Sequence, residues 1–167
     1  MIEALLRDLR QPEYVHTLLN PLPIYGLAIA TAVLLVALFQ RSRPAQVTAL
    51  VMVFVCALSI WPVMAFGERA YDNILTSSDD DGRAWLEAHE ERAESLMYVF
   101  YALASVAAAA LFVPMKWPRA AMPLVIATLL LAIGSLGAGA SIAYAGGKIR
   151  HREFRTVPPP ESTEKKP

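Results

Sequence analysis

Four long apolar runs that contain no Asp, Glu, Lys or Arg are the feature that most constrains this 167-residue chain. A bilayer core about 30 Å thick needs roughly 20 helical residues at a rise of 1.5 Å each, so each run is long enough to cross a membrane. Four buried helices of a soluble protein are the alternative, but none of the runs has the polar positions that such a helix places on its solvent side. The sequence therefore predicts an all-α, multi-pass membrane protein. Its spans lie at about residues 22–40, 47–66, 96–115 and 120–145.

The segments between the spans predict how the helices pair. Residues 41–46 (RSRPAQ) and 116–119 (KWPR) are short, basic and contain proline, so spans 1 and 2, and spans 3 and 4, should form two tight helical hairpins. Residues 67–95 are longer and polar, with a turn expected at TSSDDDG (76–82) and a helix from there into span 3. Together these segments predict a four-transmembrane-helix bundle over residues 21–153.

The two flanking segments differ from this transmembrane domain. Residues 1–20 carry acids and lack the apolar core of a secretory signal, and they predict a short amphipathic helix on the membrane surface. A frayed terminus is the alternative. Residues 154–167 are rich in proline and charge and predict a disordered tail. The apolar face of the first segment would hold Ile2, Leu5, Leu6 and Leu9.

Composition argues against several classes of function. Fifteen basic and fifteen acidic residues cancel, so no net charge points to nucleic acid. Cys56 is the single cysteine, which excludes an intramolecular disulfide. No span carries a charge at mid-membrane, and no nucleophile–base pair or phosphate loop is visible, so neither a transporter nor an enzyme is favoured. Eleven Lys and Arg residues lie on the side of the tails and four on the side of the hairpins, but the counts around span 1 are equal, so sidedness stays open.

The chain has three histidines, and all of them lie just outside a span on the same side of the predicted membrane. His16 lies six residues before span 1, His89 seven residues before span 3 and His151 six residues after span 4. If the helices continue outward, each imidazole lies about 10 Å beyond its span. His89 also continues a helical stripe that should face the bundle. That stripe comprises Ala93, Leu96, Phe100, Leu103 and Ala107.

Carboxylates occur at the same level, because Glu68 follows span 2 and Glu90 is next to His89. Imidazole and carboxylate groups can bind a transition metal, with His16, His89, His151, Glu68 and Glu90 as candidate ligands. Two neutral imidazoles from different helices could instead be the axial ligands of a haem, and all three histidines are candidates. Either kind of binding would weaken as the imidazoles protonate near neutral pH. A structural role is the alternative, with hydrogen bonds from these histidines to backbone carbonyls or lipid headgroups.

Four motifs carry a resemblance to a known family. Residues 16–24 (HTLLNPLPI) are similar to an opening H-x-L-x-N-H-x-P-I, and residues 67–70 (GERA), after Pro62, are similar to a G-E-x-A exit from span 2. Residues 89–93 (HEERA) match H-E-x-x-A, and residues 146–153 (GGKIRHRE) match G-G-x-I-R-H-x-E. In this order the motifs resemble a broad group of bacterial four-helix membrane proteins, a predicted membrane domain of unknown function.

The resemblance implies the four-helix fold and places all three histidines in shared motifs, but it implies no activity. Pro21 stands where the opening motif of the group usually has a second histidine. If that histidine is a ligand in relatives, the site is lost or altered here.

Two hypotheses of function follow. The first is an integral protein of a bacterial plasma (inner) membrane that binds haem or a transition metal through the histidine and carboxylate cluster. The second is a structural or accessory subunit of a membrane complex, without a cofactor. The expected partners are the lipid bilayer and either another membrane protein or further copies of this chain in a homo-oligomer. Nucleic acid is not an expected partner.

Overall fold

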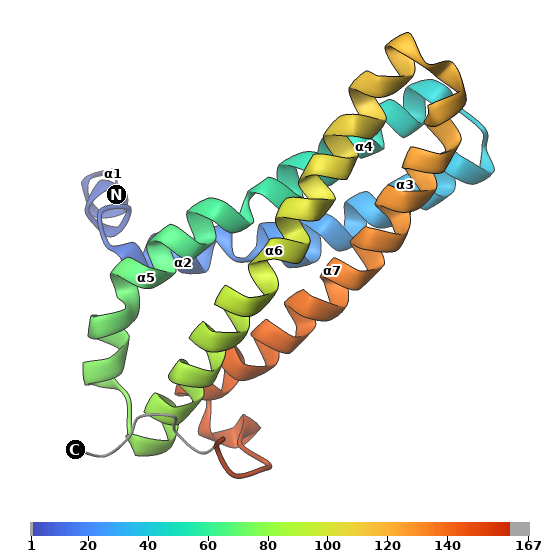
Figure 1. The fold of residues 1–167 in the computed structure, drawn as a ribbon. Coiled ribbons are helices and arrows are strands. Elements are labelled where there is room, and N and C mark those ends of the chain that lie inside the picture. The colour runs from blue at the N-terminus through green and yellow to red at the C-terminus, as the bar shows by residue number, and fades with distance from the viewer. Residues whose placement is uncertain (1, 161–167) are drawn as a thin grey trace.

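The computed structural model describes residues 2–160, and all of the regular structure in this range is helical. The range contains no strand, which confirms the predicted all-α class. A π-helical segment occupies Leu22–Gly26, and 3₁₀ segments occupy Pro118–Ala120 and Arg152–Phe154. The α-helices, shown in Figure 1, are α1 (Ile2–Asp8), α2 (Pro12–Leu19), α3 (Leu27–Phe39), α4 (Arg43–Leu58), α5 (Ile60–Ser77), α6 (Asp80–Lys116) and α7 (Ala121–Arg150).

Helices α2 to α7, with the π and 3₁₀ segments between them, form four rods that are long and apolar enough, by length and composition, to cross a membrane. The rods contain the four predicted spans except for Gln40, the last residue of span 1, which confirms the four-helix bundle. On the side of the tails, α5 and α6 continue far beyond the apolar runs, so the polar segment between spans 2 and 3 is helical except at Ser78–Asp79. The rods are Pro12–Phe39, Arg43–Ser77, Asp80–Lys116 and Pro118–Arg150.

Both predicted hairpins form, and their connections are short. Residues 40–42 join α3 to α4, and the Ser42 hydroxyl caps α4 by accepting a hydrogen bond from the Ala45 backbone N–H. Trp117 and the 3₁₀ turn that follows it join α6 to α7. As a result α3 packs against α4, α6 packs along α7, and α4 joins the two hairpins by packing against α6.

The second rod is interrupted at Ser59, between α4 and α5. Pro62 has no N–H to donate to the Leu58 carbonyl four residues earlier, which accounts for the loss of helical regularity at this point. Beyond the interruption α5 packs against α2, diverges from α6 and meets α6 again at the turn Ser78–Asp79 (Figure 1). The divergence separates the α2–α5 pair from the α6–α7 pair.

The core lies where α3, α4, α6 and α7 meet. Small residues such as Ala107 and Ala110 of α6 are fully buried and let the helix backbones approach closely. The predicted stripe on α6 does face the bundle, because Ala93, Phe100 and Leu103 are buried as well. Many large apolar side chains instead point outward, as expected for helices that contact lipid. They include Ile29, Phe39, Phe112, Leu130 and Ile133.

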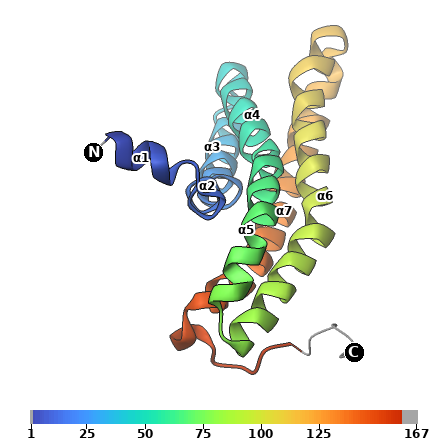
Figure 2. The same ribbon diagram turned by 90° about the vertical axis from the view of Figure 1, so that its left-hand side faces the viewer.

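The two ends of the chain lie outside the bundle of rods. α1 is a short helix that extends away from the rods in Figure 2, and its contact with a membrane surface stays a prediction. Residues 155–160 have no helix or strand, and residues 161–167 of the predicted disordered tail lie outside the described residues. The exposed apolar side chains of α1 and the residue after it are those of Ile2, Leu5, Leu6 and Leu9.

Arg155 connects the C-terminal segment to the turn between α5 and α6 through hydrogen bonds. Its guanidinium donates to both carboxylate oxygens of Asp79 at 2.9 Å and to the carbonyls of Lys148 and Ile149, at the end of α7, at 2.8 Å. Asp79 also caps α6 by accepting a hydrogen bond from the Gly82 N–H at 3.0 Å. The hydrogen bonds from Arg155 are the main cause that lowers the pKa of Asp79 to about 2, so this ion pair stays charged at neutral pH.

We expect Gly82→Ala to destabilise the protein by about 1–3 kcal/mol, because this turn has no room for a methyl group. A Cβ at Gly82 would lie 2.7 Å from Asp79 Oδ1 and 2.7 Å from the Ile149 carbonyl oxygen. The carbonyl is backbone, so relief requires α6 and α7 to move apart. The midpoint of thermal unfolding in detergent, followed by circular dichroism, measures the effect.

Gly137→Ala is the matched control, since a Cβ at Gly137 of α7 meets no atom within 4 Å. Alanine favours a helix over glycine by up to about 1 kcal/mol, so the control should keep or raise the midpoint. Equal midpoints for the two variants would contradict the close packing at Gly82.

Candidate functional site

A cavity of about 1240 Å³ lies in the space between the α2–α5 pair and the α6–α7 pair. This volume lies above the ~300–1,000 Å³ that is usual for small-ligand sites. The part of the wall nearest the bundle core is apolar and includes Pro23, Ile24, Ile60, Met64 and Phe100. The part nearest the tails is polar and includes His16, Glu68, His89, Glu90, Arg150 and His151.

His16 reaches from α2 to the neighbouring helix α5. Its Nδ1 lies 2.9 Å from the Val63 carbonyl oxygen, so Nδ1 carries the hydrogen and donates it. The ring also lies against Gly67, four residues further along α5, where a Cβ would come within 3.1 Å of Nδ1 and Cε1. Glycine at this position therefore makes room for the imidazole.

His89 repeats this arrangement in the other helix pair. It reaches from α6 to α7, and its Nδ1 donates to the Ile142 carbonyl oxygen at 3.0 Å. Gly146 lies four residues after Ile142, and a Cβ there would come within 3.0 Å of Nδ1 and Cε1 of the ring. In the described part of the chain, neither the Nε2 of His89 nor that of His16 makes a hydrogen bond. Each ring thus presents one nitrogen lone pair that none of the described residues uses.

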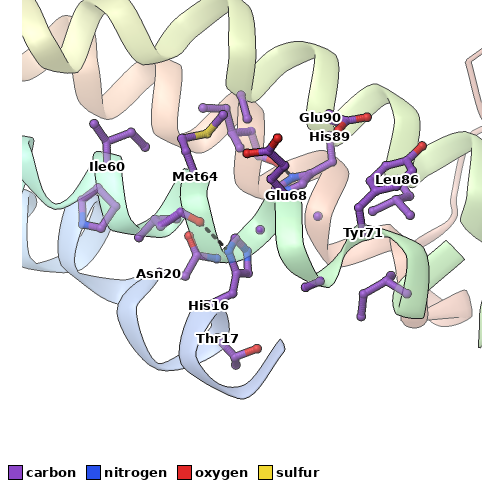
Figure 3. Close-up of a pocket in the computed structure, with 18 of the residues that line it drawn as sticks. His16, Thr17, Asn20, Ile60, Met64, Glu68, Tyr71, Leu86, His89 and Glu90 are labelled. Carbon is purple, nitrogen blue, oxygen red and sulfur yellow. Dashed lines mark hydrogen bonds between the residues drawn. The ribbon is translucent and has the colours of Figure 1, made fainter. Parts of the chain in front are cut away.

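The two imidazoles lie close to one another although they belong to different helix pairs. Their ring centres are 6.5 Å apart and their planes are at 88°. Figure 3 shows the side chains of His16 and His89 extending into the same space, with Glu68 beside them. The structure therefore brings together two of the three histidines that the sequence singled out.

The surroundings of His89 favour its neutral form. Burial is the main cause that lowers its pKa, the bond to the Ile142 carbonyl raises it, and electrostatic interactions with His16 and Arg92 lower it further. The net shift is downward, so the uncharged imidazole prevails at neutral pH. The uncharged imidazole is also the form that binds metals.

Glu68 and Glu90 line the same cavity as the paired histidines. Burial is the main cause that raises the pKa of Glu90, and repulsion from the carboxylates of Glu94, Glu68 and Glu87 raises it further. The α5 and α6 walls of the cavity are therefore acidic, and an anionic group would be repelled there.

His151 lies at the rim of the cavity, apart from the other two histidines. Its Nδ1 is 2.9 Å from Glu153 Oε1, and its ring stacks on Phe154 with the ring centres 4.9 Å apart. The side chain is 58% exposed. His151 therefore lies at the surface, where it contacts Glu153 and Phe154 and not the other two histidines.

Within residues 2–160, no group of three or more His, Cys, Asp or Glu side chains is arranged to hold a metal ion. The carboxylates of Glu68 and Glu90 share the cavity with His16 and His89, but together they do not form the three or four converging ligands of a typical zinc site. The paired imidazoles are the best-defined ligand arrangement in the described chain.

Sequence reasoning did not find the groups that hold the two rings. Gly67 and Gly146 were noted only as parts of motifs, and the carbonyls of Val63 and Ile142 carry no sequence signal at all. The positions of the two glycines in the sequence were a usable signal. Gly67 lies just after span 2 and Gly146 just after span 4, at about the height along the helices at which His16 and His89 precede spans 1 and 3.

Comparisons with models of protein families, with curated proteins and with solved structures find no match. The resemblance to a group of bacterial four-helix membrane proteins therefore stays a prediction. All four segments that carry the resemblance contribute residues to the cavity wall: 16–24, 67–70, 89–93 and 146–153.

Proposed function

We propose that this protein binds haem in the membrane, with His16 and His89 as the two axial ligands. One observation carries the proposal: two imidazoles line one cavity from two helix pairs, and the Nδ1–H of each is bound to a backbone carbonyl. Metal-ligating histidines almost always donate their second ring N–H in this way, because the bond fixes the tautomer and the ring orientation and makes the other nitrogen more basic.

The separation of the rings supports this assignment. Metal–nitrogen bonds of about 2.0 Å on both sides of an iron, with each ring centre roughly 1.1 Å behind its nitrogen, put two opposed imidazole centres about 6.2 Å apart. The centres of His16 and His89 are 6.5 Å apart. The 88° between their planes is compatible with such a pair, because ligation requires no particular angle between the two ring planes.

A structural role would explain each carbonyl bond separately but not the pairing. A histidine that only ties two helices together has no need of a second imidazole nearby or of a cavity of about 1240 Å³ beside it. A few polar atoms that project into a pocket with apolar walls typically fix the position of a ligand, and here the apolar part of the wall adjoins the two imidazoles. The combination supports a bound cofactor over a purely structural role.

Ligation by two histidines limits the chemistry that follows. With both axial positions filled by the protein, the iron has no open position for O₂ or a substrate, so the haem would exchange electrons. We therefore propose electron transfer in a bacterial plasma membrane as the function. The four apolar rods and the motif resemblance support this location.

Absorption spectroscopy of the purified protein tests the proposal most directly. The protein is purified in mild detergent, its spectrum is recorded oxidised and reduced, and its iron content is measured on the same sample. We expect a Soret band, sharp α and β bands on reduction and one haem per chain. In the ferric state, nearly perpendicular imidazole planes should give a strongly anisotropic low-spin electron paramagnetic resonance signal.

Two other outcomes would overturn the proposal. A stoichiometric metal without haem bands would support the transition-metal hypothesis. A colourless, metal-free protein that also fails to take up added haem would support the hypothesis of an accessory subunit without a cofactor.

A further inference from the structure

Arg150 is the only Lys or Arg among the described residues that line the cavity. It lies in the last turn of α7, at the rim nearest the tails. Its guanidinium donates to the Ser77 hydroxyl at 3.2 Å, and this is its only hydrogen bond within the described residues. This hydrogen bond to the end of α5 keeps the positive charge of Arg150 at the rim of the cavity. It uses one guanidinium N–H, and the other N–H groups make no hydrogen bond to a described residue.

The other cations of this region have partners away from the cavity. Lys148 is buried, and its Nζ lies 4.3 Å from the centre of the Trp85 ring and 3.8 Å from that of Tyr144. Arg92 donates to the Ser141 carbonyl and also lies over Tyr144. Positive charge at the cavity itself therefore comes from Arg150.

The position of Arg150 relative to the imidazoles follows from the helix it shares with Gly146. Gly146 packs against His89, and Arg150 lies one turn further along the same face of α7, about 6 Å toward the tails. In the opposite direction, toward the bundle core, the wall is apolar, with Ile24 and Phe100. The cavity thus has a polar end, where Arg150 supplies the positive charge on the α7 side, and an apolar end, with the two histidines between them.

A haem has the same polarity, with two carboxylate groups on one edge and apolar substituents on the others. We infer that Arg150 binds the carboxylates of a tetrapyrrole held between His16 and His89, so that the carboxylate edge faces the rim and the apolar edge faces the core. A guanidinium pairs well with carboxylates because its planar N–H groups can donate two parallel hydrogen bonds. This inference rests on the proposed function and adds the orientation of the ligand.

The acids of the cavity favour this orientation. Glu68 and Glu90 line the α5 and α6 walls and would repel the carboxylates of the ligand there. Glu13, on α2, interacts electrostatically with Arg150 and is the acid that could compete for it. Its carboxylate already accepts a hydrogen bond from the Asn73 amide. The side of the cavity near α7 is therefore the favourable place for an anionic edge.

Titration of the haem-free protein with two ligands tests the role of Arg150. One ligand is haem and the other is haem dimethyl ester, in which both carboxylates are blocked. We expect the unmodified protein to bind haem about tenfold more tightly than the ester. Arg150→Ala should reduce this preference to about threefold or less and keep the absorption spectrum of bis-histidine ligation. Arg150→Lys should keep part of the preference.

Arg152→Ala is the matched control, because Arg152 pairs with Asp79 and does not line the cavity. This variant also loses one positive charge near the rim, and it should keep the full preference for haem. An unchanged preference in Arg150→Ala would overturn the role of Arg150 and leave the haem proposal standing. Absence of a bis-histidine spectrum with either ligand in the unmodified protein would overturn both.

Discussion

Replacing His89 with alanine is expected to abolish the low-spin haem spectrum and to weaken haem binding by at least about 100-fold. The variant removes one of the two proposed axial nitrogens and leaves the Ile142 carbonyl without the hydrogen bond that it now accepts from the ring. His16→Ala should have the same effect, since the two imidazoles occupy equivalent places in the two helix pairs. Titration of each haem-free variant with haem, followed by absorption, measures both effects.

His151→Ala is the control for this pair of variants. His151 is exposed and bound to Glu153, so its loss should leave the spectrum and the affinity unchanged. Circular dichroism of all three variants shows whether the fold is kept. Loss of the spectrum in His151→Ala, or a normal spectrum in folded His89→Ala, would contradict the assignment of the ligands.

Gly146→Ala is expected to weaken haem binding by about 10- to 100-fold while both proposed axial histidines are still present. The new Cβ would lie 3.0 Å from Nδ1 and Cε1 of His89, so the ring must shift away from α7 and lose its bond to the Ile142 carbonyl. Without that bond the imidazole is no longer held in the orientation that ligation needs. The affinity for haem and the sharpness of the reduced α band are the measurements.

Gly134→Ala provides the comparison on the same helix, because a Cβ at Gly134 meets no atom within 4 Å. Both substitutions raise the helix propensity of α7 equally, so a difference between them reports on the contact with His89. If Gly134→Ala and Gly146→Ala bind haem equally well, the glycine does not position the ring.

The four-helix fold could be predicted from the sequence because one physical requirement determines it. A segment that crosses a bilayer must be long and apolar, and that requirement is visible in residues 22–40 without any knowledge of its neighbours. The two hairpins could be predicted as well, because the segments that connect spans 1 and 2 and spans 3 and 4 are short. The height of the histidines beyond the spans could be predicted too, because each helical residue adds a fixed rise along the helix axis.

Which histidines meet could not be predicted, because meeting depends on how helices turn and separate. His16 and His151 lie equally far from a span in the sequence, yet only His16 faces His89. The 3₁₀ turn that starts at Arg152 directs the chain away after α7, and the bond to Glu153 holds the His151 ring at the rim. The divergence of α5 from α6, which opens the cavity, depends on a local irregularity at Ser59 and Pro62 whose geometry the sequence does not specify.

The division of the site between two halves of the chain has a consequence for how the protein would mature. His16, Val63 and Gly67 belong to residues 12–77, whereas His89 and Gly146 belong to residues 80–150. Each half alone offers a single imidazole, which is too little to retain an iron porphyrin by two bonds. During synthesis the first half leaves the ribosome before His89 is made, so a haem held by both imidazoles could be captured only once α6 packs into the bundle. Cofactor content would therefore measure the fraction of chains that have completed assembly, and truncated chains would stay colourless.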